Sequence, residues 1–137
     1  MTVNQRSLRA FQNKVQKFAA TLPAEKLTIF HRRLALEALG RLVAKTPVDT
    51  GRARGGWIVS TGEPSLWMPG EEEVVPPEVV QAKGEKALGS LLPFDIVFVS
   101  NNVEYIEALE RGHSKQAPHG MLAETVAELS VLFLDAA

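Results

Sequence analysis

The chain has 137 residues, of which 45% are hydrophobic and 23% are charged. This is the balance of one ordinary globular domain rather than of a disordered segment. The absence of cysteine excludes disulfides, thiolate metal sites and cysteine nucleophiles. The N-terminal residues lack the apolar stretch of a secretory signal, and no apolar run approaches the roughly 20 residues that cross a bilayer. We therefore expect a soluble protein that is not exported by this route.

The charged residues are divided unevenly along the chain, although the net charge is only −1. Residues 1–60 carry eleven Lys/Arg against three Asp/Glu, a charge of +8, and residues 61–137 carry four against thirteen, a charge of −9. This division suits a nucleic-acid interface, two halves that face each other, or a basic face that meets a neighbour's acidic face. Pairing within one fold, together with solvation, explains it most simply.

The first two elements are predicted to be helices, at about 6–20 and 24–45. Apolar residues recur three and four positions apart in both segments, as on one face of an amphipathic helix. Pro23 suits the first turn of the second helix. Pro47 ends that helix, because the residue before a proline avoids the α region.

Residues 46–51 follow as a predicted tight turn. Pro47 fixes its own φ, and the side chains of Asp49 and Thr50 can bond nearby backbone amides. Gly51 can adopt a positive φ. The turn would lead the chain out of the second helix and into a strand.

That strand is predicted at about 56–61, with Trp57 on its buried face. Residues 62–77 contain four prolines and four glutamates, which predicts a long exposed loop. Trp67 lies in this loop without obvious cover. A mobile solvent loop and an arm that clasps a neighbouring subunit are both compatible with such a segment.

The remaining segments predict four more elements. A weak helix over 78–91 is expected to be interrupted by Gly84, and the β-branched and aromatic run at 94–99 is the clearest strand. A short helix that Gly112 ends comes next. Pro118 can then begin the C-terminal helix.

The order helix–helix–strand–helix–strand–helix–helix predicts an α+β fold. The expected sheet is small and antiparallel, and it is flanked by two N-terminal helices, a short helix after the last strand and a C-terminal helix. No internal repeat divides the chain. Residues 1–137 are therefore expected to form one domain, with an exposed Pro/Glu-rich loop at 62–77.

The sequence contains no recognisable catalytic constellation. The G-x-S-x-G pattern of a serine nucleophile is absent, and His113 and His119 do not form a known zinc-binding spacing. Glu104, Glu107 and Glu110 recur every three residues, which a solvated helix face explains better than paired acid/base chemistry. We therefore expect no catalytic residue, no cofactor and no metal ion, and no enzymatic activity.

Nucleic-acid binding is the main alternative that the basic first half suggests. Phosphate contacts supply much of the affinity of DNA-binding proteins, but the sequence pI of about 6.3 is low for such a domain. A small DNA- or protein-binding regulatory module is thus kept as the second interpretation. The basic strip would consist of Arg32, Arg33, Arg41, Lys45, Arg52 and Arg54.

Two segments carry a family resemblance. Residues 45–57 read KTPVDTGRARGGW, and residues 101–118 read NNVEYIEALERGHSKQAP. Together they resemble the tail-completion, or minor-tail Z-like, proteins of long-tailed bacteriophages. Those proteins pair P-V-D-T-G-R-x-R-x-x-W with a later N-x-x-x-Y-x-x-x-L-E-x-G-x-S-x-Q-A-P. They also begin with two helices and end with one, so the resemblance covers most of the chain.

The resemblance implies a virion structural protein of the phage neck or upper tail. It would complete the tail or join it to the head, as part of a ring of copies around the DNA channel, with six copies favoured over twelve. Its neighbours would be the stopper, the tail terminator and the tail tube, with genomic DNA contacted non-specifically at most and no membrane. Assembly would take place in the host cytoplasm. The +8/−9 division would supply complementary faces for the ring.

Within this family pattern, the motif residues are interpreted as structural or interface residues. The turn places two arginines just before the strand, Tyr105 and Leu109 hold the short helix, and Glu110 is expected to pair with one arginine, with Arg52 as the partner to test. The pair Gly55–Gly56 would soften the start of the strand. The interface candidates are Pro47, Asp49, Thr50, Gly51, Arg52, Arg54, Trp57, Trp67, Tyr105, Glu110, Gly112 and Gln116.

Overall fold

A computed structural model describes residues 5–48, 51–112 and 120–135 of the chain. These residues form helices and one two-stranded antiparallel sheet, so the predicted α+β fold is confirmed. None of the described helices is long and apolar enough to cross a membrane. The elements are α1 (Gln5–Ala19), α2 (Ala24–Lys45), a 3₁₀ turn (Arg54–Gly56), β1 (Trp57–Thr61), α3 (Pro77–Leu88), β2 (Val97–Asn101), α4 (Ile106–Glu110), α5 (Leu122–Leu129) and a π-helical end (Ser130–Asp135).

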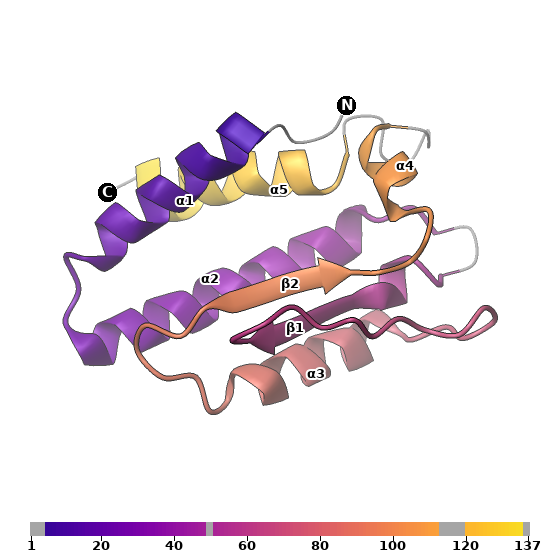
Figure 1. Ribbon diagram of the computed structural model, residues 1–137, viewed down its shortest axis with the longest axis horizontal. Coiled ribbons are helices and arrows are strands. Elements are labelled where there is room, and N and C mark those ends of the chain that lie inside the picture. The colour runs from indigo at the N-terminus through magenta and orange to yellow at the C-terminus, as the bar shows by residue number, and fades with distance from the viewer. Residues whose placement is uncertain (1–4, 49–50, 113–119, 136–137) are drawn as a thin grey trace.

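The elements form layers around α2, the longest helix (Figure 1). The sheet and α3 lie on one side of α2, and α1 and α5 lie together on the other side. The strands pair with Val59 opposite Val99 and Trp57 opposite Asn101. Helix α2 therefore contributes to two interfaces, which explains the broad apolar surface that its sequence shows.

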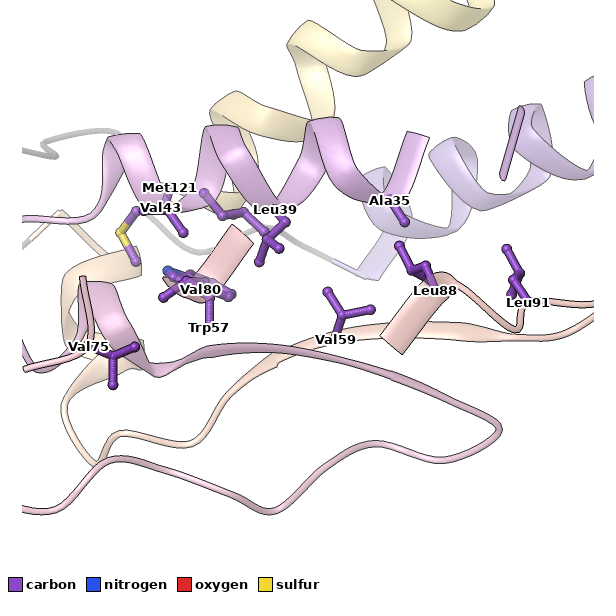
Figure 2. Packing of buried hydrophobic residues seen from close by; sticks show 11 residues of the cluster. Ala35, Leu39, Val43, Trp57, Val59, Val75, Val80, Leu88, Leu91 and Met121 are labelled. Atoms are coloured by element: carbon purple, nitrogen blue, oxygen red, sulfur yellow. The ribbon is translucent and has the colours of Figure 1, made fainter. Parts of the chain in front are cut away.

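The main core lies between α2, α3 and β1 (Figure 2). Leu39 and Leu88 are completely buried there, and Trp57 and Val59 point into it from alternate positions of β1, as predicted. Met121 adds a contact from the segment before α5. The buried cluster comprises Ala35, Leu39, Leu42, Val43, Trp57, Val59, Val75, Val80, Leu88, Leu91 and Met121.

Gly84 does not interrupt α3, contrary to the prediction. The helix continues through it, and a Cβ atom placed on Gly84 would lie 2.5 Å from Cδ2 of Leu39. The missing side chain lets α3 approach α2 closely. The glycine therefore serves helix packing rather than helix termination.

Strand β2 begins at Val97, three residues later than predicted. Residues 92–95 form a turn instead, in which the backbone N–H of Asp95 donates to the Leu92 carbonyl at 3.2 Å. The backbone N–H of Leu92 donates in return to Oδ2 of Asp95 at 2.8 Å. Pro93 sets up this turn, so the apolar residues at its end do not join the sheet.

The helices at the C-terminal end also differ in detail from the prediction. Helix α4 begins at Ile106, and α5 begins at Leu122. Pro118, the predicted start of the last helix, lies outside the described residues. Phe133 of the π-helical end contacts Phe30 of α2 with ring centroids 6.3 Å apart, which fastens the end of the chain to the body.

Candidate functional site

The two motif segments meet at the end of the sheet where β2 leads toward α4. The side-chain amide of Asn101 donates to the Ala53 carbonyl at 2.8 Å, and its oxygen accepts from the Val103 backbone N–H at 3.1 Å. Arg52 forms an ion pair with Glu104. We call the contacts of Arg52, Asn101, Asn102 and Glu104 the joint.

Arg52 is the centre of the joint and is only 7% exposed. Its Nε donates to the Gly70 carbonyl at 3.0 Å and to the Pro69 carbonyl at 3.2 Å. Its Nη1 and Nη2 contact Oε2 and Oε1 of Glu104 at 2.5 and 3.2 Å. This two-point hydrogen bonding raises the pKa of Arg52 and lowers the pKa of Glu104.

Glu110 is not the partner of Arg52, so this expectation was wrong. Its carboxylate accepts hydrogen bonds from the backbone N–H groups of Met121, Leu122 and Ala123 at 3.0, 2.7 and 3.1 Å. These groups lie at the start of α5, where backbone donors lack partners within the helix and a negative charge is favourable. Gly120, with a φ of +83°, allows the close approach, because a Cβ there would lie 2.5 Å from Oε2 of Glu110.

The loop at 62–77 is fastened to its own chain. The side-chain amide of Asn102 donates to the carbonyls of Ser65 and Trp67 at 2.8 and 2.9 Å. Trp67 packs against the main core, and Nζ of Lys83 lies 3.8 Å from the centre of a Trp67 ring. The tryptophan therefore has cover, contrary to the interpretation from sequence.

The described residues on either side of the predicted turn before β1 are fixed by contacts within the chain. Trp57 anchors the strand as predicted, and its indole Nε1 donates to the Thr46 hydroxyl at 2.7 Å, which in turn donates to the Leu42 carbonyl at 2.6 Å. Pro47 is buried. Gly51 has the expected positive φ of +82°. The candidates Asp49, Thr50 and Gln116 lie outside the described residues.

Gly55 and Gly56 permit close packing, which corrects the view that they only soften the start of the strand. A Cβ on Gly55 would lie 2.7 Å from the Val75 carbonyl oxygen. A Cβ on Gly56 would lie 2.9 Å from Oδ1 of Asn101. Any side chain at these positions would push the loop or the joint away.

Two further candidates belong to α4. Tyr105, just before the helix, is 40% exposed, and its carbonyl accepts from the Leu109 backbone N–H at 3.2 Å, whereas the Leu109 side chain packs against the core. Gly112 follows the helix with a φ of +85°, as predicted for a residue that ends it. The packing of Leu109 confirms its part in holding α4.

The charge division is partly neutralised within the chain. Arg41 and Lys45 of α2 contact Glu128 of α5 at 2.5 and 2.7 Å, and Lys45 also lies 3.7 Å from Glu124. Hydrogen bonds from Lys45 and Arg41 lower the pKa of Glu128. These ion pairs join the basic first half of the chain to its acidic second half. Pairing within one fold, the simplest explanation of the uneven charge, predicts such contacts.

The described residues contain no group of three or more His, Asp or Glu side chains that could hold a metal ion. The side chains of the joint form hydrogen bonds with backbone carbonyls, with a backbone amide and with one another, so they hold distant segments of the chain together. No family model, curated protein or solved structure matches the chain. Sequence reasoning missed Glu104 as the partner of Arg52 because Glu104, Glu107 and Glu110 carry the same signal in sequence.

Proposed function

We propose that the chain is a virion structural protein of the neck or upper tail of a long-tailed bacteriophage. It completes the tail or joins it to the head as one subunit of a ring around the DNA channel, with six copies favoured over twelve. Its neighbours are the stopper, the tail terminator and the tail tube. The proposal rests on the resemblance of residues 45–57 and 101–118 to the tail-completion family.

One observation carries the proposal beyond the sequence. The two motif segments, about fifty residues apart in the chain, converge on the joint, where Arg52 bonds Glu104 and Asn101 bonds Ala53. A pair of motifs that acts as one structural unit would show this arrangement. A catalytic pair would leave polar groups pointing into a cleft, and the polar groups of the joint are engaged with the chain itself.

The contacts give less support to the regulatory alternative. Three cations of the basic strip, Arg41, Lys45 and Arg52, are paired with glutamates of the same chain. Paired cations contribute less to phosphate binding because each partner carboxylate opposes the nucleic acid. DNA contact is therefore proposed only as a non-specific encounter with the genome in the channel.

The test is to look for the chain in particles. Mass spectrometry of purified virions from a host that carries the gene is expected to detect the protein, and gold-labelled antibody is expected to mark the head–tail junction. Deletion of the gene is expected to give heads and tails that do not join. Intact infectious particles that form without the protein would refute the proposal.

A further inference from the structure

Helix α1 carries a positively charged face that no acidic residue interrupts. Its apolar side chains are half-buried on one face, and because an α-helix has about 3.6 residues per turn, its cations lie away from that face. The cations are Arg6, Arg9, Lys14 and Lys17, all of them exposed. The first carboxylate side chain of the sequence, Glu25, comes only after the helix has ended.

This arrangement of charge does not stabilise the fold. Arg6 and Arg9 are three residues apart, as are Lys14 and Lys17, and side chains at this spacing are neighbours on a helix, so their like charges repel each other. Arg6, Arg9 and Lys17 form no ion pair among the residues that the structure describes. A helix face that is only solvated normally mixes both signs of charge. The uninterrupted positive charge therefore indicates a contact with a negatively charged partner.

Two cations of α2 extend this face. In the second half of α2, Arg41 and Lys45 pair with a glutamate of α5. Lys26 and Arg33, in the first half, are exposed, form no ion pair in the described part of the chain, and line a cavity together with Phe18 of α1. We call Arg6, Arg9, Lys14, Lys17, Lys26 and Arg33 the basic surface. Of the basic strip expected from the sequence, only Arg33 belongs to it.

The fold keeps most acidic residues away from the basic surface. Helix α1 lies on one side of α2, whereas the sheet, α3 and the loop between β1 and α3 lie on the other side (Figure 1). That loop and the first turn of α3 contain no Lys or Arg, and carry the exposed carboxylates of Glu63, Glu71, Glu72, Glu73 and Glu78. Glu124 and Glu128 of α5, on the same side as α1, form ion pairs with α2. The low pI of the whole chain therefore does not describe the side that α1 presents.

We propose that the basic surface binds nucleic acid through the phosphate backbone, without reading the base sequence. The segment from Arg6 to Lys17 extends over about 17 Å at about 1.5 Å per residue, which suits a continuous line of phosphates better than one carboxylate. Gln12, Asn13 and Gln16 are exposed on the same helix, and their amide groups can donate to phosphate oxygens as well. Combined with the proposed function, this inference assigns α1 to the wall of the DNA channel, but the binding itself does not depend on the virion role.

The acidic loop of a second copy is the weaker partner for the basic surface. Glu73 of that loop already accepts from the Gly70 backbone N–H at 3.0 Å. A protein surface also brings hydrogen-bond donors, for which the polar face of α1 offers only neutral acceptors, whereas phosphate oxygens only accept. Self-association through this surface is therefore the competing outcome of the test.

The triple variant Arg6→Gln, Arg9→Gln, Lys17→Gln is decisive, because glutamine has a similar helix propensity and removes only the charge. Binding of the full chain to a short fluorescein-labelled DNA duplex of mixed sequence is measured by fluorescence anisotropy at several salt concentrations. The parent protein is expected to bind with an affinity that falls steeply with salt. At about 0.1 M salt the variant is expected to bind about a hundredfold more weakly, and the slope of log K against log salt should fall by about one for each cation removed.

A second triple variant, Lys83→Gln, Lys86→Gln, Arg111→Gln, is the matched control. It makes the same change in net charge at exposed cations outside the basic surface, so it should bind the duplex like the parent. Urea unfolding is expected to show that both variants are folded. A second duplex of unrelated sequence should be bound equally well, because phosphates carry no sequence information.

Three results would overturn the proposal. The parent protein could fail to bind the duplex at about 50 mM salt, the α1 variant could bind like the parent, or the control variant could lose as much affinity as the α1 variant. A parent protein that ignores DNA but self-associates, in a way that salt and the α1 variant both weaken, would assign the basic surface to a second copy instead. Absence of the protein from particles would refute only the virion role.

Discussion

Arg52 and Arg54 are separated by one residue in the same motif, yet the structure treats them in opposite ways. Arg52 is buried in the joint, with two backbone carbonyls and one carboxylate as acceptors. Arg54 lines a groove between α2 and the first turn of α3, and its buried Nε has no hydrogen-bond partner among the residues described. Two arginines of one motif can therefore differ in how fully their donors are satisfied. Arg52 fastens distant segments of the chain to each other, whereas Arg54 buries its Nε without a hydrogen bond in the described residues.

The largest effect is expected from the aromatic anchor of β1, next to the joint. Trp57→Ala removes a core side chain and the hydrogen bond to Thr46, so the free energy of unfolding should fall by about 3–5 kcal/mol. Trp67→Ala is the matched control, and should lower it by no more than about 2 kcal/mol because Trp67 is only partly buried. Urea unfolding followed by circular dichroism measures both. Equal losses would contradict the anchoring role of Trp57.

The next largest effect is expected at one of two glycines in the contact between α2 and α3, Gly84 of α3, and not at the other, Gly40 of α2. Gly84→Ala should lower the free energy of unfolding by about 1–3 kcal/mol, because its methyl group would overlap the fully buried Leu39. Gly40→Ala meets only an ordinary contact with Gln81, so better helix propensity should raise the free energy by about 0.5–1 kcal/mol. Thermal and urea unfolding distinguish the two. Stabilisation by Gly84→Ala would show that the interhelical contact is looser than described.

Replacing each arginine by methionine tests how much it contributes to the free energy of unfolding. Arg52→Met should destabilise the fold, because it leaves Glu104 and two carbonyls without their donor. The loss should be smaller than for the core changes, since the Glu104 side chain is 59% exposed and its pairing is screened by water. Arg54→Met should change the free energy of unfolding by less than about 0.5 kcal/mol.

Double-mutant cycles in urea identify the partner of Arg52. The pair Arg52/Glu104 should be coupled, and the pair Arg52/Glu110 should be additive, because Glu110 is bonded to the start of α5. Coupling between Arg52 and Glu110 would show instead that these two side chains interact, as predicted from the sequence.

The smallest expected effect is the pH dependence contributed by Glu128. Its pKa is lowered below the ordinary value of 4.5 by Lys45 and Arg41. Between the two pKa values the unfolded chain holds more protons than the folded one, so this stabilisation is present above pH 4.5 and is lost as the pH falls toward the folded pKa. Glu128→Gln should flatten the loss of stability in that range. An unchanged slope in urea unfolding at several pH values would contradict the pairing.

The helices of the first half could be predicted because local signals define them completely. Apolar spacing and the prolines at 23 and 47 mark both ends of α2, and the structure agrees. The start of β2 could not be placed in the same way. Phe94 looks like a strand residue, but it lies in the turn at 92–95 that the bonds between Leu92 and Asp95 close.

The partners in the joint depend on contacts between distant segments. Glu104, Glu107 and Glu110 have equal spacing and equal chemistry, so the sequence cannot say which of them reaches Arg52. Their roles diverge only because β2 brings Glu104 to Arg52 and because the chain returns to Glu110 at α5. Trp67 likewise looked uncovered, since Lys83 meets it only through the folded loop.

The cap that Glu110 provides has a consequence for the order of folding. Met121 immediately before α5 contributes no side-chain hydrogen bond to the helix start, so the acceptor for those first amides comes from a residue more than ten positions upstream. Short helices without such an acceptor are marginal in water. The C-terminal segment should therefore gain its helical structure late, after α4 has docked, and a peptide of that segment alone should be largely unstructured.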